Sequence, residues 1–205
     1  KVLDAEGLDA ASDWVRDPDV DVDVIGGRTL PGTHPEIGSF FTRGTSRDEY
    51  AKYTEDGAVY VRNMDRLLKK WRTASTLVPK AEIVEGPKPR PYGLVFYGTT
   101  AVPMAEAATH LRKAGIEADS MRVRAFPFGD EVDAFIARHE TVFVVEQNRD
   151  GQLRQLLIAE LEVDPARLVP VLNYDGMPIT AHYVAEEIGA WFEGASDAQQ
   201  SEGGQ

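Results

Sequence analysis

The chain has no cysteine among its 205 residues. Thiolates hold iron–sulfur clusters and many zinc ions, so this absence excludes such a cluster, a cysteine zinc site and a cysteine nucleophile within the chain. It also fits a reducing compartment, where disulfides are rare, and we therefore expect a cytoplasmic location.

Long apolar runs are missing as well. No stretch approaches the roughly 18–20 apolar residues that a helix needs to cross a bilayer. The opening KVLDAEGLDA has neither the basic start nor the apolar stretch of a signal peptide, and it does not begin with methionine. We expect a processed product or a piece of a longer polypeptide.

Positively charged residues are fewer than negatively charged ones. The chain has 22 Lys and Arg and 34 Asp and Glu, which gives a formal charge of -12. Proteins bind nucleic acid and anionic membranes with Lys and Arg that neutralise phosphates. We therefore expect no nucleic-acid partner and no membrane partner.

Motifs that bind metals or phosphates are also absent. The histidines are scattered without ligand spacing, at His34, His110, His139 and His182. The turn at 98–100 follows a predicted strand, but it has neither a Walker A lysine nor the three-glycine dinucleotide fingerprint, and a helix cap is the favoured interpretation. No Ser or Thr has the glycine frame of a nucleophile elbow, so we assign no catalytic residue and no metal ligand.

What is present is the composition of a globular protein, with 42% hydrophobic and 27% charged residues. Composition divides the chain into four regions. Residues 1–77 are rich in charge and glycine, 78–91 form a proline-rich extended linker, 92–193 form a domain, and 194–205 are a small polar tail that we expect to be disordered.

The region 92–193 alternates short apolar runs with helical patterns. The predicted strands are 93–98, 119–123, 141–146 and 168–173, and the predicted helices are 101–114, 131–139, 152–161 and 181–192. Such alternation indicates right-handed crossovers. The prediction is an α/β fold, with a mainly parallel sheet and helices on both faces.

The first region is less regular, but it contains one amphipathic helix at about 58–75. Its apolar side chains recur every three or four residues, at Val61, Met64, Leu67, Leu68 and Trp71. We expect this apolar stripe to lie against the third region or another chain, with Trp71 mostly buried. The long loop 31–57 precedes it, and long ordered loops are often functional.

Two sets of side chains are candidates for contacts with a cofactor, a substrate or a neighbouring subunit. Glu146, Gln147 and Asn148 end a buried strand, at the edge where α/β sheets bind ligands and partners. Arg28 and Arg43 could each bind a carboxylate or phosphate. The alternatives are that Glu146 and Asn148 satisfy nearby loop amides, which we favour, and that the arginines form ordinary salt bridges.

Residues 97–129 and 143–161 resemble the alpha subunit of 2-oxoacid:ferredoxin oxidoreductases, and more narrowly the 2-oxoglutarate type. The matching features are a Gly-Thr-Thr turn, a Leu-Arg-Lys-Ala-Gly-Ile helix end, a Phe-Pro-Phe turn and Glu-Gln-Asn-x-x-Gly-Gln-Leu. Upstream, RTLPG, RGTSRDEYAKYTEDG and NMDRLLKKW are similar to the segment that links that subunit's pyrimidine-binding domain to its next domain.

The resemblance implies an oxidoreductase that decarboxylates a 2-oxoacid on thiamine diphosphate, with Mg²⁺. Electrons pass through [4Fe-4S] centres to ferredoxin, and the acyl group passes to coenzyme A. Region 92–193 would be the transketolase C-terminal-like domain, which supports subunit contacts. The implied partners are the beta subunit, the rest of the alpha subunit, and ferredoxin.

The chain lacks parts of a complete alpha subunit. A Tyr-Pro-Ile-Thr-Pro segment, the domain with the thiamine-activating Glu, and a Gly-Asp-Gly thiamine motif are all missing. We therefore expect a carboxy-terminal portion that binds no cofactor and is inactive alone, with Glu146, Gln147 and Asn148 facing a neighbouring domain. Two alternatives stay open: a non-catalytic α/β protein-interaction module, and a small-molecule-binding domain.

Overall fold

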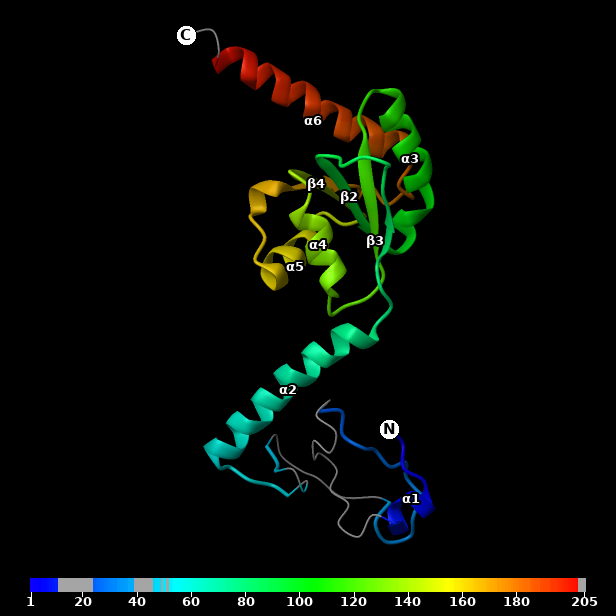
Figure 1. Ribbon diagram of the computed structural model, residues 1–205, viewed down its shortest axis with the longest axis vertical. Coiled ribbons are helices and arrows are strands. Elements are labelled where there is room, and N and C mark those ends of the chain that lie inside the picture. The colour runs from blue at the N-terminus through cyan, green and yellow to red at the C-terminus, as the bar shows by residue number, and fades with distance from the viewer. Residues whose placement is uncertain (11–23, 39–45, 49, 51, 203–205) are drawn as a thin grey trace. The chain divides into compact units, whose positions relative to one another are not determined.

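A computed structural model describes residues 1–10, 24–38, 46–48, 50 and 52–202 (Figure 1). The chain divides into two compact units, Lys1–Leu77 and Val78–Gln205. Among the described residues, no helix combines the length and the apolar character that crossing a bilayer requires.

The second unit is built on one five-stranded sheet in the order β1-β3-β2-β4-β5. Its strands are β1 (Glu82–Val84), β2 (Tyr92–Tyr97), β3 (Ala118–Val123), β4 (Thr141–Glu146) and β5 (Leu168–Leu172). Strands β3, β2, β4 and β5 are mutually parallel, and only β1 pairs antiparallel, with β3. The mainly parallel α/β sheet is therefore confirmed.

Helices cover both faces of the sheet because β2 and β4 carry buried apolar side chains on both sides. The helices are α3 (Ala101–Lys113), α4 (Asp130–Ala137), α5 (Gln152–Leu161) and α6 (Ala181–Glu202), with short 3-10 turns η1 (Gly98–Thr100) and η2 (Pro165–Arg167). One core joins α3 and α6 to the sheet through residues such as Phe143. The other core joins α4 and α5 to the opposite face, around Val144.

Two helix ends are explained by the sequence, and one is not. Gly115, in the left-handed region at φ 83°, ends α3 as predicted, and Thr180 caps α6 by accepting the Tyr183 N–H at 3.2 Å. The predicted side-chain cap of α3 by Thr99 or Thr100 is wrong, because Thr100 makes no capping bond. A 3-10 turn replaces the cap and leaves both hydroxyls to other partners.

Two predicted boundaries are also corrected. The linker 78–91 is not only a connection, since β1 lies within it and adds an antiparallel edge to the sheet. The tail expected to be disordered from residue 194 continues α6 through Glu202. Alanine, glutamine and glutamate in this stretch favour the helical backbone, although one glycine and two serines interrupt them.

The first unit contains α1 (Ala5–Ala10) and α2 (Gly57–Leu77), so the predicted amphipathic helix is confirmed. Its own unit does not bury this helix, and the expected contact with region 92–193 or another chain stays a prediction. No residue of α2 is buried, and Trp71 is 45% exposed. The periodicity identifies an apolar face, but it contains no information on whether that face is covered within the same chain.

Glu131 fastens the segment before β1 to α4. Its carboxylate accepts the Ala81 N–H at 3.0 Å and lies 3.1 Å from the Lys80 ammonium. Burial raises the pKa of Glu131. The hydrogen bonds from the N–H groups of Ala81 and Glu131, together with the Lys80 charge, lower it by a larger amount in total, so the pKa lies below its usual value.

A glycine in β2 is required by close packing. A Cβ on Gly93 would lie 2.9 Å from Phe135 Cε1 and 3.1 Å from His139 Nδ1. Gly93→Ala should therefore lower the free energy of unfolding by about 1–3 kcal/mol. Urea titration followed by near-ultraviolet circular dichroism of the Phe143–Trp191 ring contact measures this. As a control, Gly189→Ala in α6, where a Cβ meets nothing within 4 Å, should be neutral or stabilising.

The low pKa of Glu131 makes stability depend on pH. The ionised form contributes stability above the pKa of the unfolded chain, and this is lost as pH falls through the folded-state pKa. Glu131→Gln should cost about 1 kcal/mol at pH 7 and flatten the loss of stability between neutral and acid pH. The exposed Glu160→Gln should leave that slope unchanged, and equal slopes for both variants would contradict the assignment.

Candidate functional site

The carboxyl ends of β2, β4 and β5 meet at one edge of the sheet. The register pairs Phe96 with Val145 and Glu146 with Leu172, so the segments that follow these strands lie next to one another. The connection after β2 leads to α3 on one face, whereas the connection after β4 leads to α5 on the other. Ligands of open α/β sheets bind at such a divergence.

Glu146 is completely buried and points into the start of α5. Its carboxylate accepts the Leu153 N–H at 2.6 Å and the Arg154 N–H at 3.0 Å, two backbone donors in the first helical turn. A carboxylate there is further stabilised by the positive end of the helix dipole. Glu146 is therefore a helix cap that comes from a neighbouring strand.

Asn148 supports the same turn. Its amide nitrogen donates to Glu146 at 2.9 Å, and its oxygen accepts the N–H groups of Asp150 and Gln152 at 3.2 Å each. Gly151, in the left-handed region at φ 63°, allows the chain to enter the helix between these contacts. The interpretation that Glu146 and Asn148 satisfy loop amides agrees with these bonds, and Glu146 does not face a neighbouring domain.

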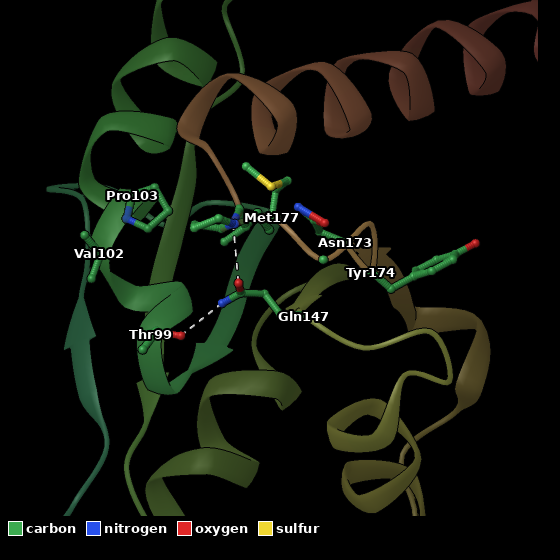
Figure 2. A pocket seen from close by; sticks show the side chains of 10 residues that line it. Thr99, Val102, Pro103, Gln147, Asn173, Tyr174 and Met177 are labelled. Atoms are coloured by element: carbon green, nitrogen blue, oxygen red, sulfur yellow. Dashed lines mark hydrogen bonds between the residues drawn. The ribbon is translucent and has the colours of Figure 1, made fainter.

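Gln147 points away from α5 and bridges three strand ends. Its amide nitrogen donates to the Thr99 hydroxyl at 3.1 Å, and its oxygen accepts the Ile179 N–H at 3.4 Å (Figure 2). The same nitrogen also lies 3.1 Å from the Thr100 hydroxyl. The side chain is exposed. Of the strand-end trio, Gln147 is the residue that an incoming molecule can reach.

A pocket of about 720 Å³ opens beside Gln147 (Figure 2). Its walls are mainly apolar and include Val102, Pro103 and Met177. Asn173, which follows β5, is 8% exposed and lines the pocket, and its side-chain oxygen accepts the Asp175 N–H at 3.4 Å. Sequence reasoning missed Asn173, although it ends an apolar strand just as Glu146 does.

Apolar side chains stand exposed around this pocket. Val102 is 83% exposed, Met177 68% and Tyr174 64%. We call these three residues the apolar rim.

Neighbouring Tyr183 is held by a bond from its hydroxyl to the Leu172 carbonyl at 2.6 Å. Burial raises the pKa of Tyr183, with additional contributions from nearby negative groups, so the hydroxyl stays protonated and keeps donating.

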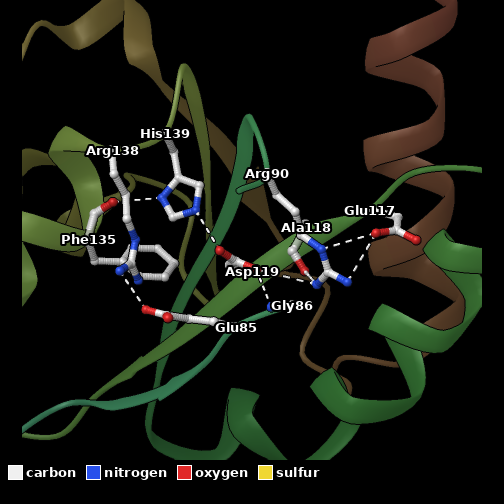
Figure 3. A network of polar contacts seen from close by, with 9 residues as sticks. All are labelled: Glu85, Gly86, Arg90, Glu117, Ala118, Asp119, Phe135, Arg138 and His139. Carbon is white, nitrogen blue, oxygen red and sulfur yellow. Dashed lines mark hydrogen bonds and ion pairs between the residues drawn. The ribbon is translucent and has the colours of Figure 1, made fainter. Parts of the chain in front are cut away.

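A second polar cluster lies at the opposite, amino edge of the sheet (Figure 3). Asp119 accepts the Gly86 N–H at 2.9 Å, the Arg90 guanidinium at 3.4 Å, and faces His139 Nε2 at 3.3 Å. His139 Nδ1 donates to the Phe135 carbonyl at 2.6 Å. His139 is therefore a buried, hydrogen-bonded packing residue.

This amino-edge cluster borders a pocket of about 400 Å³, but its cations are paired. Arg90 bonds to Glu117 at 3.1 Å, and Arg138 pairs with Glu85 (Figure 3). The pairing leaves neither guanidinium ready for an external anion. The cluster fastens the segment before β2 to β3 and to the end of α4, which is a structural role.

The arginine candidates remain predictions. Arg28 is exposed, and its backbone bonds to Lys1 and Leu3 in the first unit. Arg43 lies outside the described residues. The structure thus brings Glu146 and Asn148 together, and it describes Arg28 in the other unit.

The described side chains at the carboxyl edge do not fit thiamine diphosphate with Mg²⁺. Such a site needs free carboxylate or amide oxygens for the metal. Both oxygens of Glu146 are used by α5, and the Asn148 oxygen is used by its own turn. Within the described residues, no group of three or more His, Asp or Glu side chains could hold a metal ion. The edge offers an amide, hydroxyls and apolar surface, which suit contact with another molecule.

Comparison with known proteins gives one related sequence. The chain is 32% identical over 149 residues to a protein of Aeropyrum pernix named 2-oxoacid:ferredoxin oxidoreductase 2, subunit alpha. The match covers 71% of this chain and 23% of that protein, so the chain spans about a quarter of the relative's length. No model of a known protein family matches the chain.

A solved structure shares the fold. It is 2-oxoglutarate:ferredoxin oxidoreductase from Magnetococcus marinus, with 2-oxoglutarate, coenzyme A and succinyl-CoA bound. The superposition covers 86% of this chain and 30% of that chain, with a TM-score of 0.71 and 20% identity.

Removal of the Glu146 carboxylate should destabilise the second unit. Glu146→Ala leaves two buried N–H groups of α5 without an acceptor, and we expect a loss of about 3 kcal/mol in the free energy of unfolding, measured by urea titration. Gln147→Ala, at the exposed neighbour, is the matched control and should cost less than about 1 kcal/mol. Equal, small losses for both variants would show that the cap does not stabilise the fold.

Proposed function

We propose that this chain is the carboxy-terminal part of the alpha subunit of a 2-oxoacid:ferredoxin oxidoreductase. The similarity to the Aeropyrum pernix alpha subunit carries the proposal, because it extends over 71% of this chain at 32% identity. The fold shared with the Magnetococcus marinus enzyme is consistent with it. The proposed reaction is the oxidative decarboxylation of a 2-oxoacid to an acyl-CoA, with reduction of ferredoxin.

The proposed substrate is 2-oxoglutarate. The narrower resemblance of the Gly-Thr-Thr, Phe-Pro-Phe and Glu-Gln-Asn segments supports this choice. Substrate preference would be tested by comparing kcat/KM for 2-oxoglutarate and pyruvate in the complete complex. A preference for pyruvate would contradict the choice of 2-oxoacid and leave the reaction class intact.

Within that enzyme, we assign this segment a structural role in subunit and domain contact. The polar groups of Glu146 and Asn148 are used inside the domain, while the apolar rim is exposed. The proposed partners are the beta subunit, the rest of the alpha subunit, and ferredoxin, in the cytoplasm. Thiamine diphosphate, Mg²⁺, [4Fe-4S] and coenzyme A would be bound elsewhere in the complete complex.

The second candidate is a non-catalytic α/β protein-interaction module, which the same exposed rim favours. Copurification distinguishes the two. A beta subunit that carries thiamine diphosphate and a [4Fe-4S] cluster supports the oxidoreductase, whereas partners without redox cofactors support the module.

The purified 205-residue chain should neither bind thiamine diphosphate nor reduce ferredoxin or a viologen dye. Its carboxyl-edge ligands are used internally, and it has no cysteine for a cluster. Calorimetry with thiamine diphosphate and a viologen reduction assay measure this. The complete alpha subunit with its beta partner is the positive control, and it should oxidise a 2-oxoacid only when coenzyme A is present.

In the complete complex, Glu146→Ala should act through folding and assembly. The fraction of assembled complex in gel filtration should fall, while kcat per assembled complex stays within about threefold of the parent. Gln147→Ala provides the comparison at the exposed neighbour. Normal assembly with a fall in kcat of about a hundredfold would instead place Glu146 in the active site.

A further inference from the structure

One buried histidine of the second unit has a hydrogen-bond acceptor beside each of its ring nitrogens. The side chain of His139 is completely buried. Its Nδ1 lies 2.6 Å from the Phe135 carbonyl oxygen, and its Nε2 lies 3.3 Å from Oδ2 of Asp119 (Figure 3). A carbonyl oxygen and an ionised carboxylate only accept, so both contacts are hydrogen bonds only when each ring nitrogen carries a proton. That form of the ring is the positively charged imidazolium.

The surroundings of Asp119 favour the ionised carboxylate. Its Oδ1 accepts the Gly86 N–H at 2.9 Å and lies 3.4 Å from Nη1 of Arg90, while its Oδ2 faces His139. Several donors and a positive charge around a carboxylate stabilise its negative charge. The proton between the two side chains therefore belongs on the imidazole ring and not on the carboxyl group.

The charges of this amino-edge cluster balance when His139 is positive. Its other ion pairs join two arginines to three carboxylates, namely Arg90 to Asp119 and Glu117, and Arg138 to Glu85. A positive His139 makes three cations against three carboxylates. A neutral ring would leave one partly buried negative charge without compensation, which is costly.

Three further contacts place charges near the histidine. Arg138 stacks on the Phe135 ring with its guanidinium carbon 4.9 Å from the ring centroid, and Arg167 donates from η2 to the His139 backbone carbonyl. Lys88 lines the adjoining pocket of about 400 Å³, but it is exposed, so solvent screens its charge. The same pocket borders His139 and gives solvent a route for proton exchange.

The imidazole ring has little room to move. The Phe135 ring packs against it with centroids 4.4 Å apart, and a Cβ added to Gly93 would lie 3.1 Å from Nδ1. The bond from Nδ1 to the Phe135 carbonyl opposes rotation of the ring. When Nε2 loses its proton, its lone pair faces the carboxylate. Asp119 is then the group that has to turn away.

The position of Asp119 matters because its carboxylate also holds the loop 85–90, which joins β1 to β2. The carboxylate accepts the Gly86 N–H near the start of this loop and pairs with Arg90 at its end. Strand β1, just before the loop, is the antiparallel edge of the sheet. The attachment of the loop therefore depends on a carboxylate that the His139 proton keeps in place.

We propose that His139 and Asp119 form a proton-dependent latch for the loop 85–90. The latch is closed while both ring nitrogens of His139 carry protons, and it loosens as rising pH removes the Nε2 proton. The proposal does not depend on the oxidoreductase assignment, because it rests only on contacts within the second unit.

Nitrogen-15 NMR of the full 205-residue chain at pH 7 tests the protonation state. Both ring nitrogens of His139 should show a directly bonded proton, whereas a neutral ring shows only one. His139→Gln identifies the signals by removing them. Asp119→Asn should return Nε2 to its unprotonated form, because the new amide can donate to it. An unprotonated Nε2 in the parent, or a proton on the Asp119 carboxyl group, would overturn the assignment.

Hydrogen exchange at two backbone amides tests the latch itself. The Gly86 N–H bonds to Asp119, whereas the Ala81 N–H in the same segment bonds to Glu131 and is the internal control. Between about pH 6 and pH 8.5, after correction for intrinsic exchange, the protection of Gly86 relative to Ala81 should fall about tenfold, as expected for one lost charge-assisted bond. In His139→Gln, whose side chain does not titrate, this ratio should not change with pH.

His110→Gln is the matched control, since it makes the same substitution at a histidine of α3 whose side chain is 40% exposed. It should leave the pH dependence of the Gly86 ratio as it is in the parent. The parent measurement needs no variant, so it decides the outcome even where His139→Gln does not fold. A parent ratio that stays constant with pH, or an equal pH dependence in His139→Gln, would overturn the latch.

Discussion

The arrangement at the carboxyl edge depends on one buried carboxylate. Burying the charge of Glu146 is costly unless donors replace the lost water. Two backbone N–H groups of α5 and the Asn148 amide replace it here. The same bonds fix where α5 begins and how the chain turns after β4. They also leave Gln147, and not Glu146, to reach across to Thr99 and Thr100.

Polar side chains from distant parts of the sequence perform similar capping roles elsewhere in the second unit. Arg167 donates to the carbonyls of Ile136 and Ala137 at the end of α4, and Glu131 accepts the Ala81 N–H beside β1. Each contact adds a hydrogen bond to a backbone group near the end of a helix or strand. The fold is therefore held at its edges by nonlocal hydrogen bonds between side chains and backbone, in addition to its two apolar cores.

The nonlocal character of these hydrogen bonds explains how far the sequence could predict the structure. Apolar runs and helical periodicity are local, and they located α5 at Gln152–Leu161 and β4 at Thr141–Glu146 correctly. The rule that α/β sheets bind ligands and partners at the carboxyl ends of their strands also identified Glu146 and Asn148 as candidates. It could not give their direction, because the partners of Glu146 are backbone groups seven and eight residues later whose positions depend on the packed helix. For a related reason, periodicity defines the apolar face that contains Trp71 and does not show what covers that face.

The distribution of polar and apolar groups among the described residues is consistent with the structural role proposed above. Catalysis needs groups that are free to bind, exchange protons or hold an ion. At the carboxyl edge, the most buried acid is saturated with internal bonds. At the amino edge, Asp119 bonds to His139 and Arg90, and the remaining bonds of this cluster go to neighbouring groups of the same unit. Among the described residues, the apolar rim is exposed, and the apolar stripe of α2 is exposed within its own unit; apolar surface of this kind loses unfavourable contact with water when another surface covers it.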